Sequence, residues 1–207
     1  MDHEEIFKAA FATPTYTAIP TADSRVNSVI AESYDVDEPF TYTLTQLWDM
    51  EVKKAHRPDK YIHYVAKPGS LRIFGIRKEG DLEYFYRVTE QRSWKDPEKY
   101  TKVIEDVRLD HKNHTAFFLG VPEATTPEGE RIVAGGDQPL FHVEHSAKGT
   151  EEDPINVWSI VFLTDERDPT LVELFEKITD PKLLRGFNEV YIRDDLGRKL
   201  TRKDSKA

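Results

Sequence analysis

Hydrophobic and polar positions alternate through most of the middle of the chain, which is the pattern of strands that bury one face. These runs are rich in aromatic and β-branched residues and are separated by turns that contain Gly or Pro. The strands expected from them span residues 26–36, 61–65, 71–76, 82–89, 100–110, 115–121, 140–147 and 157–163. A Pro/Gly-rich segment at 122–139 interrupts the series, and we expect it to form a mobile loop.

Helical spacing of apolar residues occurs near both ends of the chain and once between the first strands. It predicts helices over 4–12, 44–55 and 170–178, and a last helix that runs to about residue 195. Asp168-Pro169 supplies an N-cap and a first-turn proline for the third of these helices. Thr179-Asp180-Pro181 repeats that arrangement, so we expect the C-terminal helix to be kinked or broken there.

The order of these elements is typical of an α+β protein: a strand, a helix, a series of antiparallel strands and a long C-terminal helix. Three passages add a family resemblance, namely the strand expected at 28–36 that runs into Glu38-Pro39-Phe40, the helix bearing Trp48, and the segment 58–62. Together they resemble the START-like superfamily, which includes the birch-pollen allergen type and the polyketide cyclase/dehydrase type. The resemblance covers residues 26–196. It implies the helix-grip fold, in which a curved antiparallel sheet wraps around the C-terminal helix and leaves an internal hydrophobic cavity.

The length of 207 residues suits one domain. We expect residues 1–25 to form a lead-in segment and residues 26–196 to form a single ligand-binding domain. Residues 197–207 carry five basic side chains and Asp204, and we expect them to be a flexible, solvated tail.

Composition excludes several classes of function. The 29 basic and 38 acidic side chains give a net charge of −9, which argues against binding to nucleic acid or to an anionic membrane. The chain has no cysteine, so disulfides and thiolate metal sites are excluded. No apolar run approaches the ~18 residues of a membrane span, and the acidic start does not match a secretory signal, so we expect a cytoplasmic protein without membrane insertion.

Sequence motifs narrow the chemistry further. The Gly-rich phosphate-binding and dinucleotide-binding patterns and the serine-nucleophile elbow do not occur in the chain. Hydride transfer, phosphoryl transfer and serine-triad hydrolysis are therefore not expected, and we expect no cofactor.

One carboxylate stands among apolar residues of an expected strand. On 100–110 the apolar face contains Val103, Glu105 and Val107. Burial of a carboxylate is costly unless it is paired or neutralised, and it can bring the pKa into the range useful for acid/base catalysis. Glu105 is therefore a candidate catalytic residue, with Val103 and Val107 beside it in the ligand-binding wall. The structural alternative is an ion pair with Arg87 on the neighbouring strand.

A second candidate cluster lies in residues 141–145. His142 and Glu144 share one face of an expected strand, with Cα atoms ~6.6 Å apart, so they are candidate catalytic residues. His145 shares the other face with Phe141 and Val143, and alternation alone does not decide which face is internal. A metal would need a third ligand, and no further histidine has a diagnostic spacing, so we expect no metal site.

The remaining candidates are aromatic or histidine side chains that could line the cavity, and for each the alternative is ordinary core packing. They are His63, Tyr84, Tyr86, Phe117, Trp158, Phe187 and Tyr191. Tyr86 or Arg87 could stabilise an enolate oxygen, which makes Arg87 a fourth candidate catalytic residue.

The resemblance to the START-like superfamily, together with Glu105 on an apolar strand face, implies a cofactor-independent enzyme that acts on a hydrophobic carbonyl-containing or aromatic small molecule by cyclisation, dehydration or isomerisation. The main alternative is a non-catalytic carrier or sensor of a hydrophobic molecule or lipid. A cystatin-like barrel enzyme would need longer N-terminal helices, and a protein–protein adaptor would need an exposed apolar stripe. A homodimer is left open.

Overall fold

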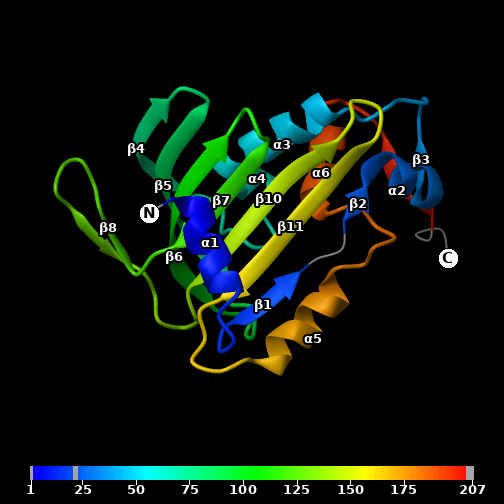
Figure 1. Ribbon diagram of the computed structural model, residues 1–207. Coiled ribbons are helices and arrows are strands. Elements are labelled where there is room, and N and C mark those ends of the chain that lie inside the picture. Colours follow the sequence, from blue (N-terminus) through cyan, green and yellow to red (C-terminus); the bar gives the residue numbers. More distant parts are fainter. Residues whose placement is uncertain (1, 21–22, 204–207) are drawn as a thin grey trace.

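The computed structural model describes residues 2–20 and 23–203, and its largest element is an antiparallel sheet with helices on both faces (Figure 1). The helices are α1 (His3–Phe11), α2 (Val26–Ser33), α3 (Leu44–His56), α4 (Pro58–Tyr61), α5 (Pro169–Ile178) and α6 (Gly186–Asp194). The strands are β1 (Thr17–Pro20), β2 (Ser24–Arg25), β3 (Tyr34–Val36), β4 (Arg72–Glu79), β5 (Leu82–Arg92), β6 (Tyr100–Asp110), β7 (Thr115–Gly120), β8 (Glu123–Thr125), β9 (Arg131–Val133), β10 (Phe141–Gly149), β11 (Pro154–Phe162) and β12 (Leu200–Arg202).

The main sheet has the strand order β1-β11-β10-β7-β6-β5-β4, and β2 also pairs with β11. Two small sheets accompany it, formed by β3 with β12 and by β8 with β9. Helices α3 and α6 lie behind the sheet in Figure 1, and the C-terminal helix is broken into α5 and α6. The expected α+β class, with an antiparallel sheet around a broken C-terminal helix, is therefore confirmed.

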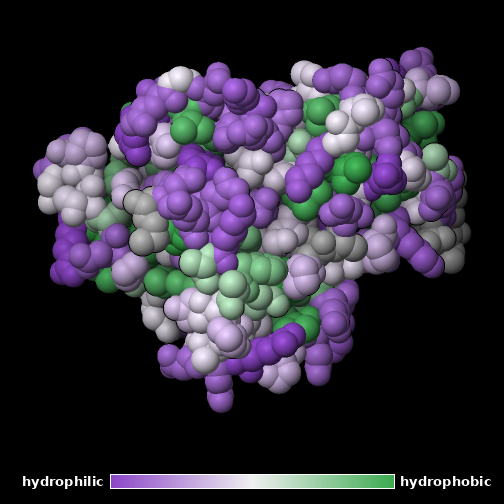
Figure 2. Space-filling view, in the orientation of Figure 1, coloured by the Kyte–Doolittle hydropathy of each residue, from purple (hydrophilic) through white to green (hydrophobic). Residues whose placement is uncertain are grey.

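Both faces of the sheet are covered, and each has its own apolar core. The main core lies between the sheet and α3, α5 and α6, and we call this face of the sheet the inner face. On the outer face, Phe7 and Ala10 of α1 pack against Phe117, Leu119 and Val161. The view in Figure 2 shows this side, with hydrophilic side chains over the first turn of α1 and hydrophobic ones near its last turn.

Helix α3 begins at a capping box, because the Thr43 hydroxyl accepts from the Gln46 backbone and the Gln46 side chain accepts from the Thr43 backbone. Its buried positions follow helical spacing and include Leu47, Glu51 and Lys54. The face that α3 turns toward the sheet therefore carries two charged side chains as well as apolar ones.

Two expected strands are wrong. Residues 26–33 form α2, whose buried residues Val26, Val29 and Ile30 have the i, i+3, i+4 spacing of a helix, and only β3 remains extended. Residues 61–65 are the end of α4 and a following turn, because Pro58 opens a short helix rather than a strand. The strand at 28–36 that contributed to the family resemblance is thus mainly helical.

The segments expected to lie outside the domain or to be mobile take part in the fold. In the lead-in segment, α1 covers the outer face and β1 extends the sheet by pairing with β11. The segment 122–139 contains the β8–β9 hairpin, which packs on Ile104. In the expected tail β12 pairs with β3, and residues 204–207 lie outside the described residues.

Helix α5 offers a direct test of the inner core. Phe175 is fully buried and packs against Trp94, Trp158 and Phe162, whereas Ile178 on the same helix is 53% exposed. We expect Phe175→Ala to lower the free energy of unfolding by about 3–5 kcal/mol, because it leaves a cavity in a packed core. Ile178→Ala, the matched control, should change it by less than about 0.5 kcal/mol. Urea denaturation of both variants makes the comparison, and equal losses would contradict this packing.

Candidate functional site

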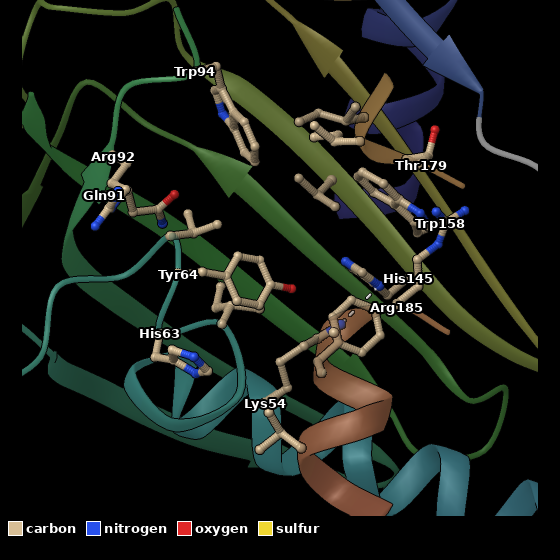
Figure 3. A pocket seen from close by; sticks show the side chains of 18 of the residues that line it. Lys54, His63, Tyr64, Gln91, Arg92, Trp94, His145, Trp158, Thr179 and Arg185 are labelled. Carbon is tan, nitrogen blue, oxygen red and sulfur yellow. Dashed lines mark hydrogen bonds between the residues drawn. The ribbon is translucent and has the colours of Figure 1, made fainter. Parts of the chain in front are cut away.

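A cavity of about 900 Å³ lies on the inner face of the sheet. Its walls come from β5, β6, β7, β10 and β11, from helices α3, α5 and α6, from the turn after α4, and from the segment that links α5 to α6. Aromatic and aliphatic side chains form most of the wall, as Figure 3 shows for Tyr64, Trp94 and Trp158. The apolar members of the wall are Ile62, Tyr64, Val65, Trp94, Phe118, Phe141, Val143, Trp158, Ile160, Leu174, Ile178, Leu183, Leu184, Phe187 and Val190.

An ion pair between neighbouring strands forms one polar part of the wall. Arg87 and Glu105 are direct partners in the β5–β6 register, and Glu105 Oε2 lies 2.8 Å from Arg87 Nε and 2.7 Å from Arg87 Nη2. Both side chains are buried. Arg87 Nη1 also donates to the backbone carbonyl of Ala55 at 3.0 Å, which ties the end of α3 to the sheet. The pairing expected by the structural alternative is present, and the pair also lines the cavity.

A second charged cluster lies beside this pair and joins α3 to β10. Lys54 Nζ lies 2.5 Å from Glu51 Oε2 and 3.0 Å from His145 Nδ1 (Figure 3 marks the latter contact). Asn156 donates to the other carboxylate oxygen of Glu51 at 3.0 Å. Lys54 Nζ also lies 4.0 Å from the centre of the Phe187 ring. Lys54 and His145 line the cavity, whereas Glu51 lies behind them.

Burial shifts the protonation of this cluster. It lowers the pKa of Lys54 from 10.5 to about 8, against the opposing effect of Glu51. It also lowers the pKa of His145 from 6.5 to about 4, helped by the charge of Lys54. Burial alone would raise the pKa of Glu51, but Lys54 and His145 outweigh it and hold that pKa at about 2. At neutral pH the cluster therefore contains a carboxylate, a neutral imidazole and an ammonium group that deprotonates more easily than usual.

The tautomer of His145 follows from these contacts. Nδ1 of His145 lies 3.0 Å from Lys54 Nζ and 3.4 Å from Glu51 Oε1. An ammonium group has donors only, so in the shorter of these contacts a charged Lys54 donates to Nδ1 of the neutral imidazole. Nε2 of His145 must then carry the ring proton. The ring stacks on Trp158, with centroids 5.8 Å apart and planes 11° from parallel, so its orientation is fixed.

The structure brings five of the sequence candidates to the cavity. Glu105, Arg87, His63, Trp158 and Phe187 all line it, although His63 lies on an exposed turn rather than on the expected strand.

Three candidates lie on the inner side but contribute to the core instead of the cavity wall. Val103 and Val107 are buried among other core residues. The Tyr191 hydroxyl donates to Asp49 at 2.6 Å.

The other candidates lie on the outer face of the sheet, which corrects their expected position. Tyr84 contacts His3 of α1, Tyr86 stacks on Phe74, and Phe117 packs on Phe7. On β10 the residues that face the cavity are Phe141, Val143 and His145, so His142 and Glu144 point the other way. The expectation failed because a layer of helix and hairpin covers the outer face too, so both faces carry aromatic side chains.

Lys54 and Glu51 are the charged residues of the candidate site that sequence reasoning missed. Both occupy the buried stripe of α3, at positions 51 and 54 of a helix whose apolar spacing includes Leu47 and Ala55. The sequence does place two charged residues at positions that continue this apolar stripe, and that spacing could have indicated their burial. His145 was identified only as the alternative to His142.

Metal and membrane sites are not found in the described part of the chain. Among residues 2–20 and 23–203, no group of three or more His, Asp or Glu side chains is arranged to hold a metal ion. Within the same residues, every helix is too short or too polar to span a bilayer.

Comparisons with known proteins give distant likenesses. No protein-family model and no curated protein matches the chain. Among solved structures, the Zhui aromatase/cyclase from Streptomyces sp. R1128 has a TM-score of 0.42 at 8% identity, over 77% of this chain and 94% of that one. A protein of Thermus thermophilus has a TM-score of 0.37 at 13% identity, over 83% of this chain and 97% of that one. A quaternary ammonium Rieske monooxygenase has a TM-score of 0.39 at 11% identity, over 84% of this chain and 39% of that one.

Likenesses with TM-scores below 0.5 carry no information on function. The resemblance to the START-like superfamily and the subfamily within it therefore stay predictions from the sequence.

The buried cluster predicts how stability depends on pH. His145 binds a proton near pH 6.5 in the unfolded chain but only near pH 4 in the folded chain, so acidification between these values favours unfolding. This difference is worth up to about 3 kcal/mol, at about 1.4 kcal/mol for each pKa unit. We expect the free energy of unfolding of His145→Gln to fall less steeply over this range than that of the parent protein.

The matched control is His63→Gln, because His63 is exposed. In His63→Gln the free energy of unfolding should change with pH as steeply as in the parent protein. Burial also lowers the pKa values of His56 and His142, but both residues remain in all three proteins and contribute equally to each. Urea titrations at several pH values measure the slopes. The same slope in His145→Gln and the parent would contradict the burial of a neutral His145.

Proposed function

We propose that this protein is a cofactor-independent enzyme that moves protons on a hydrophobic carbonyl-containing or aromatic small molecule held in the cavity. The reaction class is cyclisation, dehydration or isomerisation. The observation that carries the proposal is the buried Arg87–Glu105 pair in the wall of a cavity that is also lined by aromatic and aliphatic side chains. Acid/base groups at functional sites are typically buried beside a charge partner, as here.

Glu105 is the proposed acid/base residue. The hydrogen bonds that its carboxylate accepts from Arg87 and Gln91 both reach Oε2. Oε1 makes no hydrogen bond within residues 2–20 and 23–203, so it can approach a proton next to the carbonyl group of the ligand. The guanidinium of Arg87 has more N–H donors than its contacts use and can stabilise the enolate oxygen that forms.

His145 takes the place of His142 in this proposal. A neutral imidazole with its proton on Nε2 can donate a hydrogen bond to a carbonyl oxygen without adding a charge to the cavity. Trp158 holds the ring in place by stacking. Flat aromatic walls suit a planar ligand, since stacked rings gain energy beyond the burial of their area.

A non-catalytic carrier is the second candidate, and one observation favours it. Both buried ion pairs are satisfied within the protein, so a ligand could fill the apolar part of the cavity without reacting. Binding and turnover therefore have to be measured separately.

The test uses 2-tetralone, a small aromatic ketone with acidic α-protons, in deuterated buffer. We expect the protein to accelerate exchange of these protons, measured by NMR, and Glu105→Gln to lower the protein-catalysed rate by at least about 100-fold. Glu123→Gln, an exposed carboxylate on β8, is the matched control and should keep the full rate. Circular dichroism verifies that both variants are folded.

Quenching of Trp94 and Trp158 fluorescence reports binding of the ketone in the same samples. Binding of the ketone without faster proton exchange would overturn the proposed catalytic function and favour the non-catalytic carrier. No binding would overturn both candidates.

A further inference from the structure

Lys54 has no role in the proton transfer proposed above, although its amine is in the wall of the same cavity. Lys54 as a whole residue is 3% exposed, which is unusual for lysine. Its Nζ lies between Glu51, His145 and the ring of Phe187, at 2.5, 3.0 and 4.0 Å, so its position is fixed from three sides.

We propose that Lys54 is a nucleophile that condenses with the carbonyl group of an aldehyde or ketone in the cavity to form a protonated imine. This inference rests on the proposed function, because it requires that the cavity admit a carbonyl compound. It assigns a covalent intermediate to a residue outside the Arg87–Glu105 pair.

The step balances without another reactant. The carbon of the carbonyl group forms a double bond to Nζ, the carbonyl oxygen leaves as water, and two of the three ammonium protons leave with that oxygen. The nitrogen keeps one proton and its positive charge. His145 Nδ1, 3.0 Å from Nζ, is placed to carry a proton from the nitrogen to the oxygen.

The charges of the cluster favour the same product. Glu51 is fully buried, so it needs a cation beside it. While Lys54 is neutral, a proton on His145 Nδ1, 3.4 Å from Glu51 Oε1, supplies that cation. A protonated imine keeps the positive charge on the same nitrogen, 2.5 Å from the carboxylate, so the ion pair persists. Removing the charge from Lys54 without replacing it would leave Glu51 unpaired.

The reactive amine also needs access to its neutral form. Burial lowers the pKa of Lys54 to about 8, and the positive charge of Arg87 acts in the same direction. Desolvation and a neighbouring cation are the two ways in which proteins activate a lysine for imine formation.

An imine would in turn assist the proton transfer proposed above. A protonated imine withdraws electrons more strongly than a ketone, so the α-proton of the bound molecule becomes easier for Glu105 to remove. The substrate class becomes narrower, because an aldehyde or an unhindered ketone can condense with an amine whereas an ester or a carboxylate does not.

The test uses 2-naphthaldehyde, an aromatic aldehyde without α-protons, together with sodium cyanoborohydride, which reduces an imine to a stable amine. We expect peptide mapping by mass spectrometry to find the naphthylmethyl group on Lys54, formed at least about tenfold faster than on any surface lysine. 2-Methylnaphthalene, which has no carbonyl group, should slow labelling of Lys54 and leave surface lysines unaffected.

Two variants serve as controls. Lys54→Arg keeps a cation beside Glu51 but removes the nucleophile, and it should lose the fast labelling. Lys177→Arg replaces an exposed lysine at the rim of the cavity and should keep it. The peptide map of the unaltered protein decides the matter even if Lys54→Arg does not fold.

The outcomes separate this inference from the proposed function. Binding of 2-naphthaldehyde without preferential labelling of Lys54 would overturn the proposed imine. It would not affect the proposed acid/base function, which the exchange of 2-tetralone protons tests separately. No quenching of tryptophan fluorescence by 2-naphthaldehyde would overturn both, because the cavity would then not admit an aromatic carbonyl compound.

Discussion

Four charged side chains, Glu51, Lys54, Arg87 and Glu105, are buried together between α3 and the inner face of the sheet. Removing charges from water is costly, so each must keep its partner for the fold to be stable. One pair joins two neighbouring strands and the other joins two turns of α3. Because Arg87 also donates to the carbonyl of Ala55, the two pairs fix how α3 sits on the sheet.

This arrangement gives the cavity a polar end and apolar walls. The charges are balanced within the protein, so the cavity can hold a largely hydrophobic molecule and still present a carboxylate, a guanidinium, an amine and a neutral imidazole to it. The low local dielectric strengthens every interaction of these groups with a ligand. A carbonyl group of a ligand can interact with several of these side chains at once.

The sequence predicted the six strands of the main sheet between residues 71 and 163, helix α3 and the break between α5 and α6 well, because each has a clear period or an N-cap. It did not predict the β8–β9 hairpin, which lies in the segment expected to be a mobile loop. It failed at 26–36 and 61–65, where short apolar runs fit both a helix and a strand. For the site, Glu105 was identifiable as a carboxylate on an apolar face. Which faces of β5, β7 and β10 are internal was not identifiable, because α1 and the β8–β9 hairpin bury the outer face as well.

The central claim is that the charged cluster and the apolar walls form one binding site. A crystal structure with 2-tetralone bound tests this claim most directly. We expect the ring system to lie between the aromatic walls. We expect either the ketone oxygen or, if an imine has formed, the carbon bonded to Lys54 to contact the buried charged cluster. A ketone bound elsewhere on the protein, or wall side chains that fill the cavity and leave no room for the ring system, would contradict it.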